Sequence, residues 1–208
     1  MLDKPKNVYL VRLSDPDNKL VIIYHMFIVS INILRVIPHL IAFAFHPQRD
    51  LILSDTYTVK NLVLSLIFSK HYRNLFYYRV GNSKYFFKWI LPEEKSIHIP
   101  VRMQLGKSAL FVHNISSYLN AKSIGDFFVC YQHVTIGTNR VENNEKPTIG
   151  SNVTICTGAV IVGGITIGDN VTIGANTVVI KNVPSDSVVV GNPAKIVKLN
   201  GERVNILL

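Results

Sequence analysis

Several features are scarce in this 208-residue sequence, and each scarcity excludes a class of protein. The two cysteines, Cys130 and Cys156, are too few for a disulfide framework, and they do not form a C-x-x-C pair. No His/Cys cluster is present, so no bound metal is expected. Glycine and proline are not abundant enough for a collagen-like or low-complexity chain. Small buried thiols in a reducing cytoplasm are the expectation.

Acidic residues are also few, and they are absent between Thr56 and Pro92. The formal net charge is +9, and residues 1–95 carry 13 Lys and Arg against 7 acids. The acid-free window interleaves cations with aromatic side chains, a composition that favours a membrane surface or an anionic ligand. The alternative is a helical unit whose aromatics are core and whose cations are solvated. Peripheral membrane contact through this region and a solvated helical unit both stay open, and no nucleic-acid partner is expected.

Residues 20–45 form a long apolar run. Arg35 and Pro38 argue against a membrane span, because a central arginine is expensive in lipid and proline kinks or ends a helix. A buried or interfacial helix broken near Pro38 is therefore predicted. The run is too long and too late for a signal peptide, and no small-residue cleavage site follows it. One or two further helices are predicted over residues 51–80, with Ser54 or Asp55 as N-cap.

A six-residue repeat dominates the second half of the chain. Between Thr148 and Val183, an aliphatic residue recurs at every sixth position (149, 155, 161, 167, 173 and 179), followed by small or turn-forming residues. This period predicts a solenoid with three short strands per coil of a triangular prism. The repeat continues upstream but slips twice by one residue, and the second slip contains the polar stretch 138–147. That stretch is predicted to be a projecting loop, either functional or a tolerated insertion. The domain prediction is a helical region over 1–95 and a solenoid over 96–208.

Three motifs carry a resemblance to a known family. They are Ala121–Gly125 leading into Gln132–Gly137, Pro147–Val153 after the loop, and Lys181–Pro184 followed by Val190–Val197. Together they resemble the serine-acetyltransferase branch of the hexapeptide-repeat acyltransferases, and especially its relatives that O-acetylate bacterial polysaccharides. The resemblance covers about half of the chain. It implies a left-handed parallel β-helix, acetyl-CoA as co-substrate, and a homotrimer with active sites at subunit junctions.

The resemblance also implies a catalytic base, His113. An alcohol has a very high pKa and must lose its proton as it attacks the thioester, and a neutral imidazole can accept that proton near pH 7. His98 is a candidate to orient His113, and a backbone carbonyl is the alternative. His133 is either a second polar group at the acceptor site or an exposed corner residue.

By the same resemblance, coenzyme A lies along the groove between neighbouring prisms. Small residues allow close approach of its pantetheine arm to the backbone, and lysines meet its phosphates. The matching positions are Gly137, Thr138, Thr157, Gly158, Gly174, Ala175, Lys181 and Lys195.

Two departures from serine acetyltransferases concern the acceptor. Val112 replaces an acceptor-binding aspartate, and Glu145-Lys146-Pro147 replaces the family's Arg-His-Pro. The expected acceptor is therefore a carbohydrate hydroxyl, of a capsule, O-antigen or related polysaccharide precursor, with the enzyme at the cytoplasmic face of the membrane. Serine O-acetyltransferase is the enzymatic alternative. A non-catalytic solenoid scaffold or metal-binding module is the other.

Overall fold

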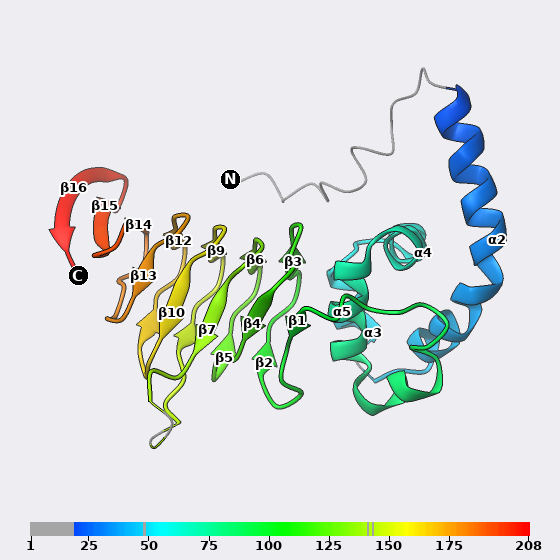
Figure 1. Ribbon diagram of the computed structural model, residues 1–208, viewed down its shortest axis with the longest axis horizontal. Coiled ribbons are helices and arrows are strands. Elements are labelled where there is room, and N and C mark those ends of the chain that lie inside the picture. Colours follow the sequence, from blue (N-terminus) through cyan, green and yellow to red (C-terminus); the bar gives the residue numbers. More distant parts are fainter. Residues whose placement is uncertain (1–18, 48, 141, 143) are drawn as a thin grey trace. The chain divides into compact units, whose positions relative to one another are not determined.

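The computed structural model describes residues 19–47, 49–140, 142 and 144–208, and side chains from residue 32 onward apart from Arg49 and Leu51. The described chain divides into two compact units, with the division between Glu94 and Lys95. The first is helical and the second is a β-solenoid (Figure 1). Each unit is described by itself.

The helical unit contains four α-helices and a 3-10 helix among its described residues. They are α2 (Lys19–Ala44), α3 (Arg49–Ser54), α4 (Val59–Phe68), α5 (Lys70–Arg79) and η1 (Gly81–Phe86). The N-caps are Thr58, whose hydroxyl accepts from Asn61 N at 3.1 Å, and Ser69, which accepts from Tyr72 N at 3.0 Å. The predicted caps Ser54 and Asp55 are wrong, because Asp55 is buried and pairs with Arg79 instead.

Helix α2 does not break at Pro38, which corrects the sequence prediction. Proline removes one backbone N–H donor from the helical hydrogen bonds. The helix nevertheless continues, because one side of α2 packs into the core of the helical unit. His39, the next residue, is fully buried, and its Nδ1 lies 3.0 Å from the Arg35 carbonyl oxygen. Its Nε2 lies 2.8 Å from the Tyr77 hydroxyl. Among the described helices, none has the length and apolarity to cross a membrane.

The buried position of His39 predicts a pH-dependent stability of the helical unit. Burial lowers the His39 pKa from 6.5 to about 4. Because the unfolded state binds the proton first, stability is lost as pH falls from about 6.5 to about 4, by about 3 kcal/mol. Urea denaturation at a series of pH values should show this loss in the wild type and not in His39→Gln. An equal slope in both proteins would contradict it.

The solenoid consists of three parallel sheets that form the faces of a triangular prism. One face contains β1 (Ile97–His98), β4 (Ser117–Leu119), β7 (Thr135–Gly137), β10 (Val160–Val162) and β13 (Val178–Val179). The second contains β2 (Gln104–Leu105), β5 (Ser123–Ile124), β8 (Thr148–Ile149) and β11 (Thr166–Ile167). The third contains β3 (Leu110–Phe111), β6 (Val129–Cys130), β9 (Thr154–Ile155), β12 (Thr172–Ile173), β14 (Ser187–Val190), β15 (Lys195–Leu199) and β16 (Glu202–Leu207). The last two strands pair antiparallel and close that face.

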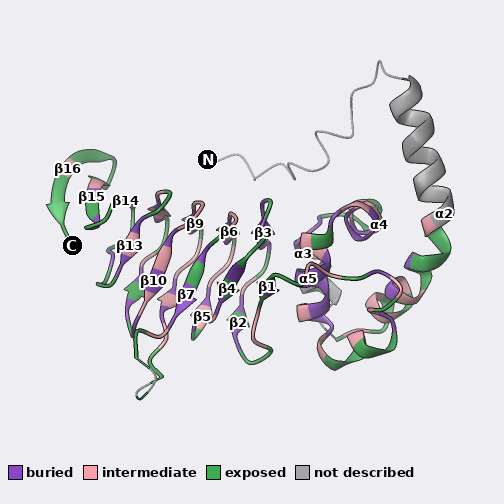
Figure 2. Cartoon of the chain, viewed as in Figure 1, coloured by how far each residue is buried: buried purple, intermediate pink, exposed green. Residues whose placement is uncertain are grey.

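The six-residue repeat is the vertical stacking of inward side chains. Ile161, for example, pairs with Ile136 in the coil below and with Val179 in the coil above. All six aliphatic positions from Ile149 to Val179 are at most 2% exposed, and buried and exposed residues alternate along the strands (Figure 2). The left-handed β-helix fold is therefore confirmed. The polar stretch 138–147 projects from the solenoid between β7 and β8 (Figure 1), and its residues Val141 and Asn143 lie outside the described part.

Candidate functional site

His113 occupies an enlarged corner of the prism. In the register of the sheets, Phe111 pairs with Cys130 and Tyr118 pairs with Thr135. The first coil therefore spans this corner with residues 112–117, whereas the next coil uses only 131–134. The two extra residues push the corner outward, and His113 stands on it, exposed and with φ 47°.

Hydrogen bonds hold this enlarged corner in shape. The Val112 amide donates to the Cys130 carbonyl at 2.9 Å, and the Ser116 amide donates to the Ser96 hydroxyl at 3.0 Å. The amide of Asn114 is fully buried and donates to the Cys130 sulfur at 3.3 Å. A fixed corner is what a catalytic base needs, because misplacement by about 1 Å can cost about 10²-fold in rate.

The same edge of the prism carries His133 one coil higher. Its backbone N–H donates to the Ile115 carbonyl at 2.9 Å, and its φ of 60° is left-handed like that of His113. We call this edge the His corner: residues 112–117, 131–134, 156–159 and 174–177 in successive coils. The structure thus brings His113 and His133 to one edge on adjacent coils.

His98 lies on β1 and stacks on Tyr118, which lies on β4 just beyond the His corner. Their ring centroids are 4.5 Å apart and their planes differ by 9°. Both rings are exposed on the β1–β4–β7 face. The structure therefore pairs the His98 ring with Tyr118.

The predicted coenzyme A residues fall at different edges of one chain. Thr157, Gly158, Gly174 and Ala175 belong to the His corner. A Cβ on Gly158, whose φ is 72°, would collide with the Asn176 side-chain oxygen. Gly137, Thr138 and Lys181 lie at the edge that carries the polar loop, and Lys195 begins β15.

The loop edge carries a pocket that the sequence reasoning did not identify. We call this edge the loop corner: residues 99–103, 120–122, 138–147, 163–165 and 180–182. The pocket has a volume of about 510 Å³, and its lining includes cations from three coils together with one acid. These charged residues are Arg102, Lys122, Lys146 and Glu145. Each cation lies one or two positions before a strand of the second face, a signal that the sequence did contain.

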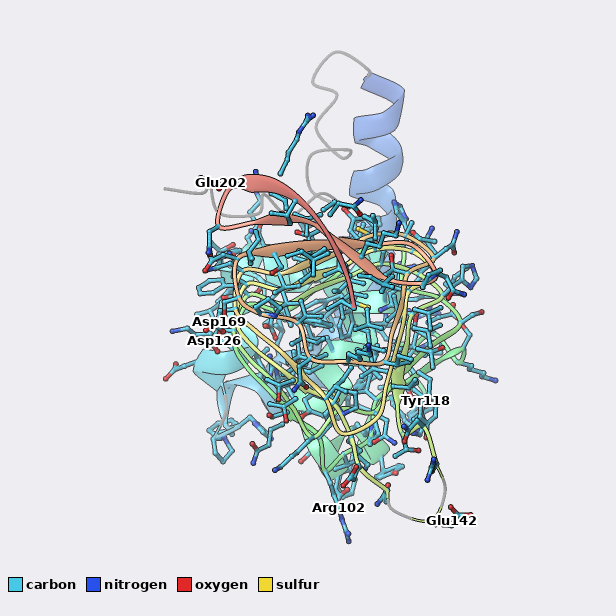
Figure 3. All side chains as sticks on the ribbon, turned by 90° about the vertical axis from the view of Figure 1, so that its left-hand side faces the viewer. Arg102, Tyr118, Asp126, Glu142, Asp169 and Glu202 are labelled. Atoms are coloured by element: carbon cyan, nitrogen blue, oxygen red, sulfur yellow. The ribbon has the colours of Figure 1, made fainter. Side chains whose placement is uncertain are left out.

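The two edges are separate in a single chain. Viewed along the solenoid, Tyr118 lies toward the right, whereas Arg102 and Glu142 of the loop corner lie at the bottom (Figure 3). In the strand order, His113 lies between the third and first faces, whereas the charged pocket lies between the first and second faces, so the two are on different edges of the same prism.

The cysteines are poor nucleophiles here. Burial raises the pKa of the Cys130 thiol well above its usual range, and it also raises the pKa of Cys156. A thiol kept protonated does not form a covalent acyl intermediate readily. Among the described residues, no group of three or more His, Cys, Asp or Glu side chains could hold a metal ion.

Comparison with protein families identifies the repeat. Residues 146–181 match the family described as bacterial transferase hexapeptide (six repeats). This part of the chain therefore carries the hexapeptide repeat of the bacterial transferases.

Comparison with characterised proteins gives relatives named serine acetyltransferase. One from Synechocystis is 42% identical over 113 residues, covering 53% of this chain and 45% of the relative. One from Staphylococcus aureus is 43% identical over 110 residues, covering 52% of each. The chain spans about half the length of the curated relatives it matches. These names support the serine-acetyltransferase branch of the predicted resemblance, and they do not support the predicted closeness to polysaccharide O-acetyltransferases.

Solved structures agree on the fold. Soybean serine acetyltransferase superposes with a TM-score of 0.63 at 26% identity, covering 75% of this chain and 72% of that one. The enzyme from Neisseria gonorrhoeae superposes with a TM-score of 0.65 at 24% identity, covering 78% and 69%. The second likeness concerns the fold alone.

Proposed function

We propose that this protein is an acetyl-CoA-dependent O-acetyltransferase in which His113 is the general base. The observation that carries the proposal is the enlarged, hydrogen-bonded corner that presents His113 on a hexapeptide solenoid. The relatives named serine acetyltransferase support the reaction class.

The chemistry is a direct transfer. The acceptor hydroxyl gives its proton to the neutral His113 imidazole while its oxygen attacks the thioester carbonyl, and collapse of the tetrahedral intermediate releases the coenzyme A thiolate. The imidazolium then returns the proton to the thiolate. General-base assistance of this kind is worth about 10²–10⁴-fold in rate. Thr157, Gly158, Gly174 and Ala175 continue the His corner upward and are proposed to line the pantetheine arm. Gly137, Thr138, Lys181 and Lys195 are proposed to be contributed by the adjoining prism.

Serine is the acceptor that we propose first. A zwitterionic amino acid needs a cation for its carboxylate and an anion for its ammonium group. The sequence lacks the family's aspartate and arginine, but the loop-corner pocket contains Arg102, Lys122 and Lys146 beside Glu145. These groups can take over both roles at different positions. This interpretation replaces the expectation of a carbohydrate acceptor, which depended on the absence of such a clamp.

We propose that a homotrimer completes this divided site. The pocket and His113 lie on different edges of one prism, so a single chain cannot present both to one acceptor. Threefold packing would set the loop corner of one subunit against the His corner of its neighbour. We propose that assembly as the active form.

A carbohydrate acceptor remains the second candidate, and one observation favours it. Val112, beside the base, is 5% exposed and apolar, so it offers nothing to an ammonium group. A neutral sugar needs only hydrogen-bonding partners. Acceptor-dependent thiol release from acetyl-CoA, measured with L-serine and with a panel of sugars and oligosaccharides, distinguishes the two. Release with sugars and none with serine would replace serine by the second candidate.

The pocket charges give a separate prediction. Glu145→Gln and Arg102→Gln should each raise the KM for serine by about 10–100-fold with a smaller change in kcat, since each removes a charged hydrogen-bond partner. Lys107→Gln is the matched control, because it removes an exposed cation, paired with Asp126 at 3.7 Å, from another edge. An unchanged KM in both pocket variants would remove the pocket from the acceptor site.

A further inference from the structure

The η1 segment of the helical unit and the turn after it expose three aromatic side chains. Tyr85, Phe86 and Trp89 are 63%, 85% and 77% exposed. They lie on η1 and in the turn that follows it. We call them, with Lys84 and Lys88, the aromatic-basic patch. The Lys84 and Lys88 ammonium groups lie 5.7 Å and 4.9 Å from the centre of the Tyr85 ring.

The exposure is built into the packing of the segment. Phe87, between two patch residues, is 5% exposed, and its ring centroid lies 4.8 Å from that of His39. Leu91 is also buried, and its carbonyl accepts from the Tyr77 hydroxyl at 2.6 Å. With Phe87 and Leu91 buried, Trp89 between them faces solvent. The Trp89 indole N–H donates to the Phe86 carbonyl at 3.2 Å, which fixes the ring and satisfies its polar atom.

A second apolar surface of the same unit lies on α2 and on the residue that follows it. Leu34, Ile37, Ile41 and Phe45 follow a helical spacing and are 73%, 44%, 56% and 86% exposed. The opposite side of this helix carries the buried Val36 and His39. Contiguous exposed apolar surface of this kind marks an interaction site. Leu34, Ile37 and Ile41 are aliphatic and cannot stack on nucleic-acid bases, so this part of the surface favours the acyl chains of lipids.

The charge pattern indicates which surface is bound. No acid occurs from Thr56 to Pro92, and both lysines of the patch flank the aromatic rings. Tryptophan and tyrosine rings are favoured at the level of lipid headgroups, and lysines near a bilayer are attracted by anionic lipids. Since no described helix can cross a membrane, the contact would be peripheral.

We infer that the aromatic-basic patch docks the protein on the surface of a bilayer that contains anionic lipid. Phe86 and Trp89 enter the interface, and Lys84 and Lys88 meet the headgroups. This role is independent of the acetyl transfer proposed above.

The test uses the fact that Trp89 is the sole tryptophan of the chain. Its fluorescence therefore reports the patch directly in the full-length protein. Vesicles of phosphatidylcholine containing a minority of phosphatidylglycerol should shift the emission to the blue and carry the protein down on sedimentation. Pure phosphatidylcholine vesicles should do so much more weakly, and added salt should weaken the anionic case.

Variants that keep Trp89 measure how much the phenyl ring and the two lysines of the patch contribute to vesicle binding. Phe86→Ser should weaken vesicle binding by about 10–100-fold, because the variant lacks the phenyl ring that enters the bilayer interface. Lys84→Gln with Lys88→Gln should weaken it by about 30-fold. Leu207→Ser, which changes a side chain of the solenoid that is 62% exposed, is the control and should bind as the wild type does.

Folding is checked by the thermal midpoint of each variant. If Phe86→Ser does not fold, the lysine pair carries the test alone. Equal binding to neutral and anionic vesicles would overturn the assignment of an anionic surface. Absence of any spectral shift or sedimentation would overturn the proposed binding to a bilayer. A protein that does not bind vesicles but is retained on DNA, in a salt-sensitive way that depends on the patch lysines, would also overturn it.

Discussion

Replacing His113 with asparagine should lower kcat for acetyl transfer by about 10²–10⁴-fold, because the acceptor hydroxyl then loses its proton without a general base. Asparagine is chosen because it tolerates the left-handed conformation observed at this position, where φ is 47°. The enlarged corner should therefore keep its shape. Steady-state rates of thiol release measure the effect.

The matched control is His133→Asn, one coil above on the same edge and also left-handed, with φ 60°. It should change kcat by less than about tenfold, because His133 is not the proton acceptor. Wild-type binding of coenzyme A by His113→Asn would separate lost chemistry from lost substrate. Equal effects of the two substitutions, or no effect of either, would contradict the role of His113.

Truncating Arg79 should destabilise the helical unit by about 3–5 kcal/mol, because the change leaves a buried carboxylate without its cation. The side chains of Arg79 and Asp55 are 1% and 0% exposed, and Arg79 Nε lies 3.1 Å from the Asp55 carboxylate. Urea denaturation of Arg79→Ala should show the loss in the transition that reports the helices.

The double variant Arg79→Met with Asp55→Leu removes both charges together. It should recover most of the lost stability, since replacing a buried ion pair with apolar groups is often neutral or better. Lys70→Ala, which truncates an exposed cation on the same helix, is the control for surface charge. A change below about 1 kcal/mol in Arg79→Ala would show that the pair is not a structural element of the unit.

The sequence predicted the solenoid well because the six-residue period follows from the geometry of the coils. A residue that points inward in every strand must be aliphatic, and the spacing of Ile149, Ile155 and Ile161 therefore shows directly in the sequence. The same argument located the projecting loop, since a polar insertion breaks the period. The fold and the projecting loop were accessible without coordinates.

The shape of the His corner was not accessible, for an instructive reason. The thirteen residues from Phe111 to Ile124 appeared as a slip of one. In the structure they combine two extra residues before Leu119, which is inward and fully buried, with one fewer after it. The compensation concealed the enlarged corner that carries His113.

The helical unit was harder to predict because tertiary contacts override local signals. Pro38 is a strong helix breaker, yet α2 continues past it because neighbouring residues of the helix are buried. Asp55 resembles an N-cap in sequence, and its actual role is set by Arg79, 24 positions away. The loop-corner pocket was missed because its cations come from three different coils.

The assignment of the acceptor depends on the loop corner, whose pocket the sequence reasoning did not identify. Val112 and Glu145 stand where the family has an aspartate and an arginine, and from sequence the absence of those two charges argued for a neutral sugar. Arg102 and Lys122 are far from that motif in the chain, but the coil geometry brings them to the same pocket as Glu145. Substitutions at motif positions therefore do not by themselves exclude an acceptor.

The central claim is tested most directly by incubating the purified protein with acetyl-CoA and L-serine, and measuring thiol release together with the mass of the product. The account predicts serine-dependent release and a product heavier than serine by one acetyl group. Release with sugars and none with serine would keep the transferase and replace its acceptor. No release with any acceptor, together with no detectable binding of coenzyme A, would contradict the account.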